Sequence, residues 1–142
     1  MKDVIVKEQI FNHPINKVWD AISKQEEIST WFIKADFKAV KGYQYTFTAS
    51  PAENCVPITG EVKEADPYVL SYTWIVQDTE AETLVTWKLE EVEGGTKLHL
   101  EHSGISGYKG DTAVQMFNSF NGGWDNCMNE LSTYLRKEVH AK

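Results

Sequence analysis

Residues 85–102 read VTWKLEEVEGGTKLHLEH, a pattern typical of two β-strands joined by a tight turn. Apolar and polar residues alternate on both sides of the Gly94-Gly95 pair, which favours a hairpin turn. Because successive side chains of a strand point to opposite faces, this alternation places every second residue on one apolar face. The residues of that face are Val85, Trp87 and Leu89 before the turn and Leu98, Leu100 and His102 after it.

Extended patterns also occur upstream of this hairpin. They cover residues 2–11, 34–40, 43–48, 58–63 and 70–76. Short turns join most of these segments, so we expect a largely antiparallel sheet of six to seven strands. Only one face of the sheet is apolar, and such a face requires a cover.

Two short helices are predicted directly after the first strand. The His13-Pro14 pair ends that strand because proline cannot continue a ladder of hydrogen bonds. Four apolar residues between positions 15 and 22 then follow at i, i+3, i+4 and i+7, which is one face of a helix. A polar gap at residues 24–27 precedes a second helix that carries Ile28 and Trp31.

The last thirty residues predict a long helix that covers the sheet. Apolar residues recur there at every third or fourth position, with an interruption at Gly122-Gly123. From Trp124 to Glu138 this helix would be roughly 22 Å long at ~1.5 Å per residue, enough to cross a curved sheet. The apolar stripe consists of Val114, Phe117, Phe120, Trp124, Met128, Leu131 and Leu135.

Composition narrows the class of protein. The 142 residues are 42% hydrophobic and 25% charged, which is typical of a globular chain, and we expect one domain over residues 1–142. The formal net charge of -7 repels phosphate backbones and anionic membranes, so neither nucleic acid nor a membrane is an expected partner.

The sequence shows no sign of secretion, metal binding or a cofactor. The first residues lack the apolar core of a signal peptide, and no stretch approaches 18 apolar residues, so we expect a cytoplasmic protein. Cys55 and Cys127 lack the spacing of metal ligands and are interpreted as ordinary thiols. No cofactor or metal motif is present in the sequence.

Several short motifs follow one another in the order of a known superfamily. They are residues 10–22, Trp31-Phe32, Gly60-Glu61-Val62 with Asp66-Pro67, residues 70–74, residues 86–89, residues 95–98, residues 102–104, Gly123-Trp124, and Leu131 with Tyr134-Leu135. Together they resemble the START-like (SRPBCC) superfamily of the birch-pollen allergen, and within it the subfamily related to the activator of heat-shock protein 90 ATPase.

The resemblance implies an α+β helix-grip fold, in which a curved antiparallel sheet wraps around a long C-terminal helix. It implies the fold more firmly than the function, because relatives include lipid and hormone binders, polyketide cyclases and co-chaperone domains.

Inward-facing side chains could line an apolar chamber between the sheet and the C-terminal helix. Ring-bearing side chains with a few polar groups are typical of sites for small apolar ligands. A solid core without a cavity is the alternative interpretation of the same residues. The candidate lining is Tyr45, Phe47, Tyr72, Trp74, Trp87, His102, Tyr108, Phe117, Phe120, Trp124 and Met128.

His102 is the polar residue of most interest in this set. Its parity with Leu98 and Leu100 turns it inward, where it could bind a ligand oxygen or exchange a proton. The favoured interpretation is a structural histidine bonded to a backbone group, because no carboxylate accompanies it. Tyr108 lies in a glycine-rich loop that either gates the chamber or simply connects two elements.

Three functions are compatible with the sequence. The first is a module that binds a small hydrophobic molecule such as a lipid, an aromatic metabolite or a polyketide-like compound. The second, implied by the resemblance, is a co-chaperone-like module with a protein partner such as a chaperone. The third is a cyclase or dehydratase with Tyr72 and His102 as proton donors. We favour binding over catalysis because no complete catalytic set is present, and the sequence does not predict the oligomeric state.

Overall fold

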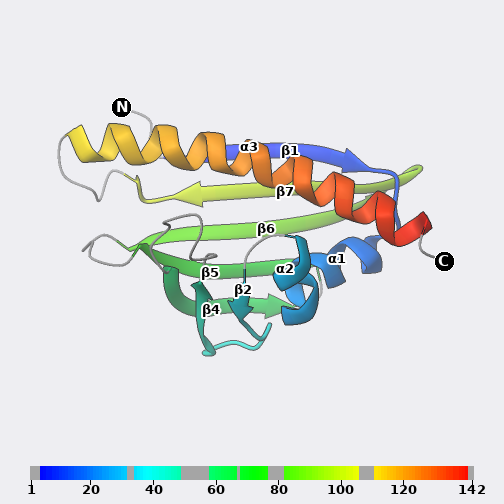
Figure 1. The fold of residues 1–142 in the computed structure, drawn as a ribbon, viewed down its shortest axis with the longest axis horizontal. Helices are drawn as coiled ribbons and strands as arrows, with labels where there is room; N and C mark the ends of the chain where they lie inside the picture. The colour runs from blue at the N-terminus through cyan, green and yellow to red at the C-terminus, as the bar shows by residue number, and fades with distance from the viewer. Residues whose placement is uncertain are drawn as a thin grey trace.

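Seven antiparallel strands form one curved sheet in the computed structural model, which describes residues 4–31, 34–48, 58–66, 68–76, 82–105 and 111–140 (Figure 1). The order across the sheet is β1-β7-β6-β5-β4-β3-β2, and each neighbouring pair is antiparallel. This confirms the predicted sheet of six to seven strands. The strands are β1 (Ile5–Phe11), β2 (Lys34–Asp36), β3 (Gln44–Thr48), β4 (Ile58–Asp66), β5 (Val69–Val76), β6 (Thr83–Val92) and β7 (Gly95–Ser103).

The turn of the β6–β7 hairpin is Glu93-Gly94, one residue before the predicted Gly94-Gly95 pair, and Gly95 pairs with Val92 as the first residue of β7. This shift changes the pairing but keeps the predicted residues on one face. Val85 pairs with His102 and Trp87 pairs with Leu100, and all four side chains are buried. The turn passes through Gly94, whose φ of +85° is one that glycine adopts readily.

Strand β2 is shorter than the predicted segment of residues 34–40. It ends at Asp36, and the next backbone N–H, that of Phe37, donates to the side-chain oxygen Oε1 of Gln25 at 3.0 Å. The Gln25 side chain therefore takes the place of a neighbouring strand as the hydrogen-bond partner of Phe37. The Phe37 side chain packs in the core, with only 1% of its surface exposed.

Helices α1 (Ile15–Ser23) and α2 (Gln25–Trp31) follow β1, as predicted. Lys24 separates them in an extended conformation, and its backbone N–H closes α1 on the Asp20 carbonyl. The indole Nε1 of Trp31 donates to the Ala21 carbonyl at 2.7 Å, which fixes α2 against α1.

Helix α3 (Asp111–His140) lies alongside β1 (Figure 1). It runs unbroken through Gly122 and Gly123, where an added Cβ would meet nothing within 4 Å. The Lys7 Nζ on β1 contacts Asp125 Oδ1 on α3 at 2.8 Å. Two short helices after the first strand, the curved sheet and the long C-terminal helix together confirm the predicted α+β helix-grip fold.

Strands β4 and β5 approach each other closely at Gly60. A Cβ at this position would lie 2.0 Å from the Thr73 carbonyl oxygen and 2.7 Å from a ring carbon of Tyr45. The Tyr45 ring thus lies over Gly60, and its hydroxyl donates to the Thr73 carbonyl. Only glycine leaves space for this arrangement, which fixes one wall of the interior.

Candidate functional site

Aromatic side chains from three strands meet on the inner face of the sheet. Tyr45 and Phe47 come from β3, Tyr72 and Trp74 from β5, and Trp87 from β6. All five are buried. Their alternate positions along the strands turn them to the same side, so the structure brings together the strand residues that the sequence assigned to the apolar face.

The rings form one continuous cluster that reaches α3. Ring centroids lie 4.7 Å apart for Tyr45 and Phe47, 6.0 Å for Phe47 and Trp74, and 5.3 Å for Trp74 and Trp124. Separations of this size are those of aromatic rings in van der Waals contact. Around these five strand residues the described interior is therefore packed ring against ring.

His102 belongs to a series of hydrogen bonds that links Trp124 to the backbone of Trp74. Trp124 Nε1 lies 2.9 Å from His102 Nδ1, and Thr83 Oγ1 lies 2.7 Å from His102 Nε2. Because an indole N–H can only donate, Nδ1 must be the unprotonated acceptor and Nε2 must carry the proton. Nε2 then donates to Thr83 Oγ1, and the Thr83 hydroxyl donates to the Trp74 carbonyl at 3.0 Å.

This network leaves His102 without a free nitrogen. The side chain is fully buried and stacks on Phe120 with 4.6 Å between ring centroids. Burial lowers the pKa of His102 to about 4, so the ring is neutral at pH 7. The sequence favoured a backbone partner for this histidine, whereas its partners are the side chains of Thr83 and Trp124.

The buried tyrosine hydroxyls are also held in hydrogen bonds. Trp87 Nε1 donates to the Tyr72 hydroxyl oxygen at 2.9 Å, and the Tyr45 hydroxyl donates to the Thr73 carbonyl. Burial raises the pKa of both tyrosines well above the ordinary value. Both groups are therefore neutral and poor proton donors at physiological pH.

Helix α3 buries its apolar stripe unevenly. In its C-terminal half, Trp124, Cys127, Met128, Leu131 and Leu135 are all buried. In its N-terminal half, Val114 is 48% exposed, and Met116, Phe117 and Phe120 are only partly buried against the core. The two halves meet where Phe120 and Trp124 contact Trp74 and His102. Tyr108, the remaining candidate, lies outside the described residues.

Two residues of this cluster were missed in the sequence. Phe37 lies against Tyr45, Phe47 and Tyr72, but the strand that precedes it is too short to show a period. Thr83 could have been found, because it has the same parity as Val85 and Trp87 and so faces inward.

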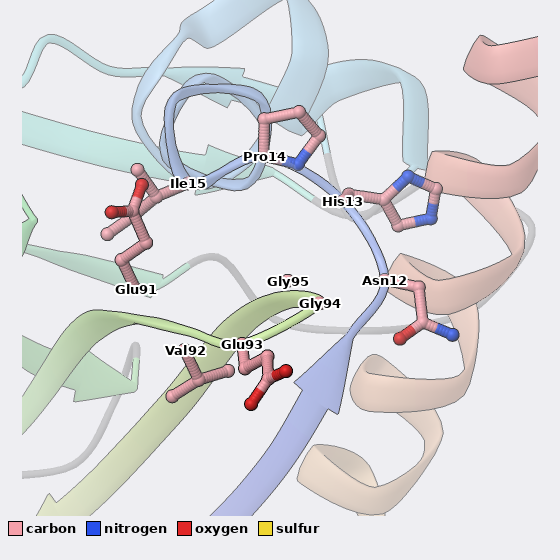
Figure 2. Close-up of a pocket in the computed structure, with 9 residues that line it drawn as sticks. All are labelled: Asn12, His13, Pro14, Ile15, Glu91, Val92, Glu93, Gly94 and Gly95. Carbon is pink, nitrogen blue, oxygen red and sulfur yellow. The ribbon is translucent and has the colours of Figure 1, made fainter.

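Three pockets lined by described residues do not include Trp74, Trp87 or His102, although one of them reaches Tyr45 of the inner cluster. One, of about 420 Å³, follows the polar side of β3, β4 and β5 around Thr59 and Thr73, and another, of about 570 Å³, lies beside Lys88 and His99. The third, of about 640 Å³, is an open hollow between the turn after β1 and the tip of the β6–β7 hairpin (Figure 2).

The polar side chains around the third pocket do not converge on its centre. In Figure 2 the side chains of Asn12 and His13 point away from the gap, toward the side where α3 lies, and the Glu91 carboxylate lies beside Ile15 at its rim. No cluster of three or more metal-ligating side chains occurs among the residues with described structure. Within the same residues, no helix is both long and apolar enough to span a membrane.

A family model and several solved structures are similar to this chain over most of its length. The sequence model described as "Activator of Hsp90 ATPase homolog 1-like protein" matches residues 12–136. No curated protein matches the chain. Among solved structures, BH1534 from Bacillus halodurans is 32% identical over 94% of this chain and 96% of its own, with a TM-score of 0.74.

Two other solved structures are similar in fold. MLL2253 from Mesorhizobium loti is 27% identical, with a TM-score of 0.84 over 94% of this chain and 97% of that chain. DynU16, from the dynemicin biosynthetic locus, is 20% identical with a TM-score of 0.81. The match covers 96% of this chain but 48% of DynU16, so the chain spans about half the length of that protein. At this identity the likeness to DynU16 shows the fold alone.

Proposed function

The chain belongs to the family of Activator of Hsp90 ATPase homolog 1-like proteins, and on that premise we propose that it binds a small, apolar, ring-containing molecule. The site lies between the N-terminal half of α3 and strand β5. The fold commonly binds hydrophobic ligands. The observation that carries the proposal is the uneven burial of α3, whose stripe is sealed from Trp124 onward and half open at Phe117 and Phe120.

The open half of the helix supplies apolar surface that a ligand would remove from water. Burial of apolar area contributes roughly 25 cal/mol per Å². A ligand seated there would meet the rings of Phe117 and Phe120 on the helix and, through Phe120, that of Trp74 on the sheet. Flat rings suit this position because neighbouring aromatic side chains can stack on them or meet their edges.

Binding at this place requires side-chain movement. The described rings pack against one another, so a ligand seated among them displaces the partly exposed rings of Phe117 and Phe120. Rotamer changes of partly exposed side chains are fast, on the order of picoseconds to nanoseconds. The sealed half around Leu131 stays in place because its side chains have no free surface.

The interior favours binding without turnover. Both nitrogens of His102 are engaged, and Tyr72 is held neutral by burial. A general acid or base needs a proton-exchanging atom within reach of the substrate and a pKa near the working pH. Neither residue meets both requirements, so we do not propose the cyclase-type reaction.

The test combines ligand detection with a charged variant at the open half of α3. Native mass spectrometry of the gently purified protein and thermal-shift titration with fluorene, a flat apolar probe, should show a one-to-one complex and a concentration-dependent stabilisation. Phe117→Lys should weaken fluorene binding roughly tenfold, because an ammonium group would be placed beside the apolar ligand. Asn118→Lys, on the exposed side of the same helix, is the matched control and should leave binding unchanged. A lack of saturable fluorene binding would reject the proposal.

A protein-interaction module is the second candidate, favoured by one feature of the sheet edge. Within the described residues, strand β1 pairs only with β7, and it exposes Val6 by 49% and Ile10 by 59%. An exposed apolar edge strand is a surface on which another chain can pair. Binding of purified heat-shock protein 90 that Ile10→Lys abolishes and Phe117→Lys preserves would favour this candidate over the first.

A further inference from the structure

The indole N–H of Trp74 is a buried donor for which the described residues provide no acceptor. The side chain is 5% exposed, yet its Nε1 is the one buried side-chain nitrogen or oxygen without a hydrogen-bond partner in the described part of the chain. The indole N–H groups of Trp31, Trp87 and Trp124 all donate to identified acceptors. A buried donor without an acceptor is costly to the fold, so its retention calls for an explanation.

Three side-chain acceptors of this cluster each already accept one hydrogen bond. His102 Nδ1 accepts from Trp124, Thr83 Oγ1 accepts from His102, and the Tyr72 oxygen accepts from Trp87. Among these groups His102 Nδ1 has no further lone pair, and the two hydroxyl oxygens could accept again only in addition to the hydrogen bonds that they already make. A ligand hydroxyl could accept from Trp74, but its own proton would then need the second lone pair of a hydroxyl group that already makes a hydrogen bond, whereas a carbonyl oxygen has no such requirement.

The charge of the interior limits the ligand further. His102 is the only basic side chain among the described buried residues, and its ring is neutral. A ligand carboxylate would thus be buried without a compensating cation, which costs far more than burying a neutral carbonyl. A neutral oxygen that only accepts hydrogen bonds fits the available groups best.

We propose that the bound molecule is a neutral ketone or ester on a flat ring skeleton, whose carbonyl oxygen accepts a hydrogen bond from Trp74 Nε1. The inference rests on the proposed function and adds the chemical group by which the site recognises its ligand. Trp74 is suitably placed, because its ring contacts Phe120, the partly exposed residue of α3, with 6.4 Å between centroids. A ligand that enters at the open half of α3 thus reaches Trp74 past this ring.

Three probes with one skeleton test the inference. Fluorene has no oxygen, 9-fluorenone has a carbonyl acceptor, and 9-fluorenol has a hydroxyl at the same carbon. Dissociation constants are measured for the wild type and for Trp74→Phe, with Trp19→Phe as a control that removes an indole packed against Tyr68. The wild type should prefer fluorenone over both other probes. The ratio of the fluorene to the fluorenone constant should fall roughly tenfold in Trp74→Phe and stay unchanged in Trp19→Phe.

The outcomes separate the inference from the proposed function. If no probe binds the wild type, the proposed function fails and the inference fails with it. If all probes bind but Trp74→Phe leaves the ratio unchanged, only the inference is overturned. A measurement on the wild type covers the case in which Trp74→Phe does not fold. The indole N–H proton of Trp74 should shift downfield in nitrogen-15 NMR spectra with fluorenone but not with fluorene, and equal shifts with both probes would contradict the inference.

Discussion

Trp74→Phe, Trp87→Phe and Trp124→Phe remove the same atoms from three contacting places in one core, and we expect them to differ in stability. The three side chains are 5%, 2% and 3% exposed, so each variant loses a similar amount of buried ring surface. What differs is the indole N–H. Trp87 and Trp124 donate to Tyr72 and His102, whereas Trp74 has no acceptor among the described residues.

The hydrogen-bond terms set the size of the difference. Removing a donor from a buried pair leaves the acceptor unsatisfied, which costs about 1–3 kcal/mol in Trp87→Phe and in Trp124→Phe. Removing the unpaired N–H of Trp74 instead relieves a cost of the same order. Trp74→Phe should therefore be less destabilising than either other variant by about 2 kcal/mol or more.

The assay is equilibrium unfolding in urea, followed by circular dichroism rather than tryptophan fluorescence. Free energies of unfolding are compared only if the denaturant slopes agree, because a changed slope signals an altered unfolded or native state. Equal losses for Trp74→Phe and Trp124→Phe would refute the assignment of Trp74 Nε1 as an unpaired donor.

Two further predictions concern the backbone and the buried histidine. Gly60→Ala should destabilise the protein by more than about 3 kcal/mol or prevent folding, because its Cβ would lie 2.0 Å from the Thr73 carbonyl oxygen. Gly122→Ala, where an added Cβ meets nothing within 4 Å, should instead stabilise the helix by up to about 1 kcal/mol. Urea unfolding that ranks the two variants alike would contradict this prediction. The pKa of His102 is about 4 in the folded protein and 6.5 in the unfolded chain, so the unfolded chain binds more protons between these two values. The contribution of His102 to stability is therefore fully present above pH 6.5 and falls by about 3 kcal/mol as the pH drops to 4. The difference in unfolding free energy between wild type and His102→Gln, measured from pH 4.5 to 7.5, should show this slope, and a flat difference would be inconsistent with a neutral buried ring.

Much of the fold could be predicted from the sequence because single-faced strands carry a period of two. The alternation of residues predicted that Trp87 and His102 face inward, and both are buried, although the turn lies at Glu93-Gly94 rather than at the predicted Gly94-Gly95. The length of strand β2 was not predicted correctly, because its end is set by a hydrogen bond to the Gln25 side chain, a contact that no local pattern reveals.

The candidate site was less predictable because its character depends on pairing rather than on position. Parity places Trp74, Trp87 and His102 on one face, but it does not say which indole N–H finds an acceptor. Nor does the regular spacing of the stripe on α3 indicate that its burial changes at Phe120. Such differences arise from the distances between elements, which the sequence does not contain.

The most direct test of a ligand site between α3 and β5 is a crystal structure of the protein grown with 9-fluorenone. The account predicts the probe between Phe117, Phe120 and Trp74, with its carbonyl oxygen within hydrogen-bond distance of Trp74 Nε1. A probe bound only in a surface hollow, such as the one beside Pro14 and Gly95, with the rings of α3 unmoved, would contradict it.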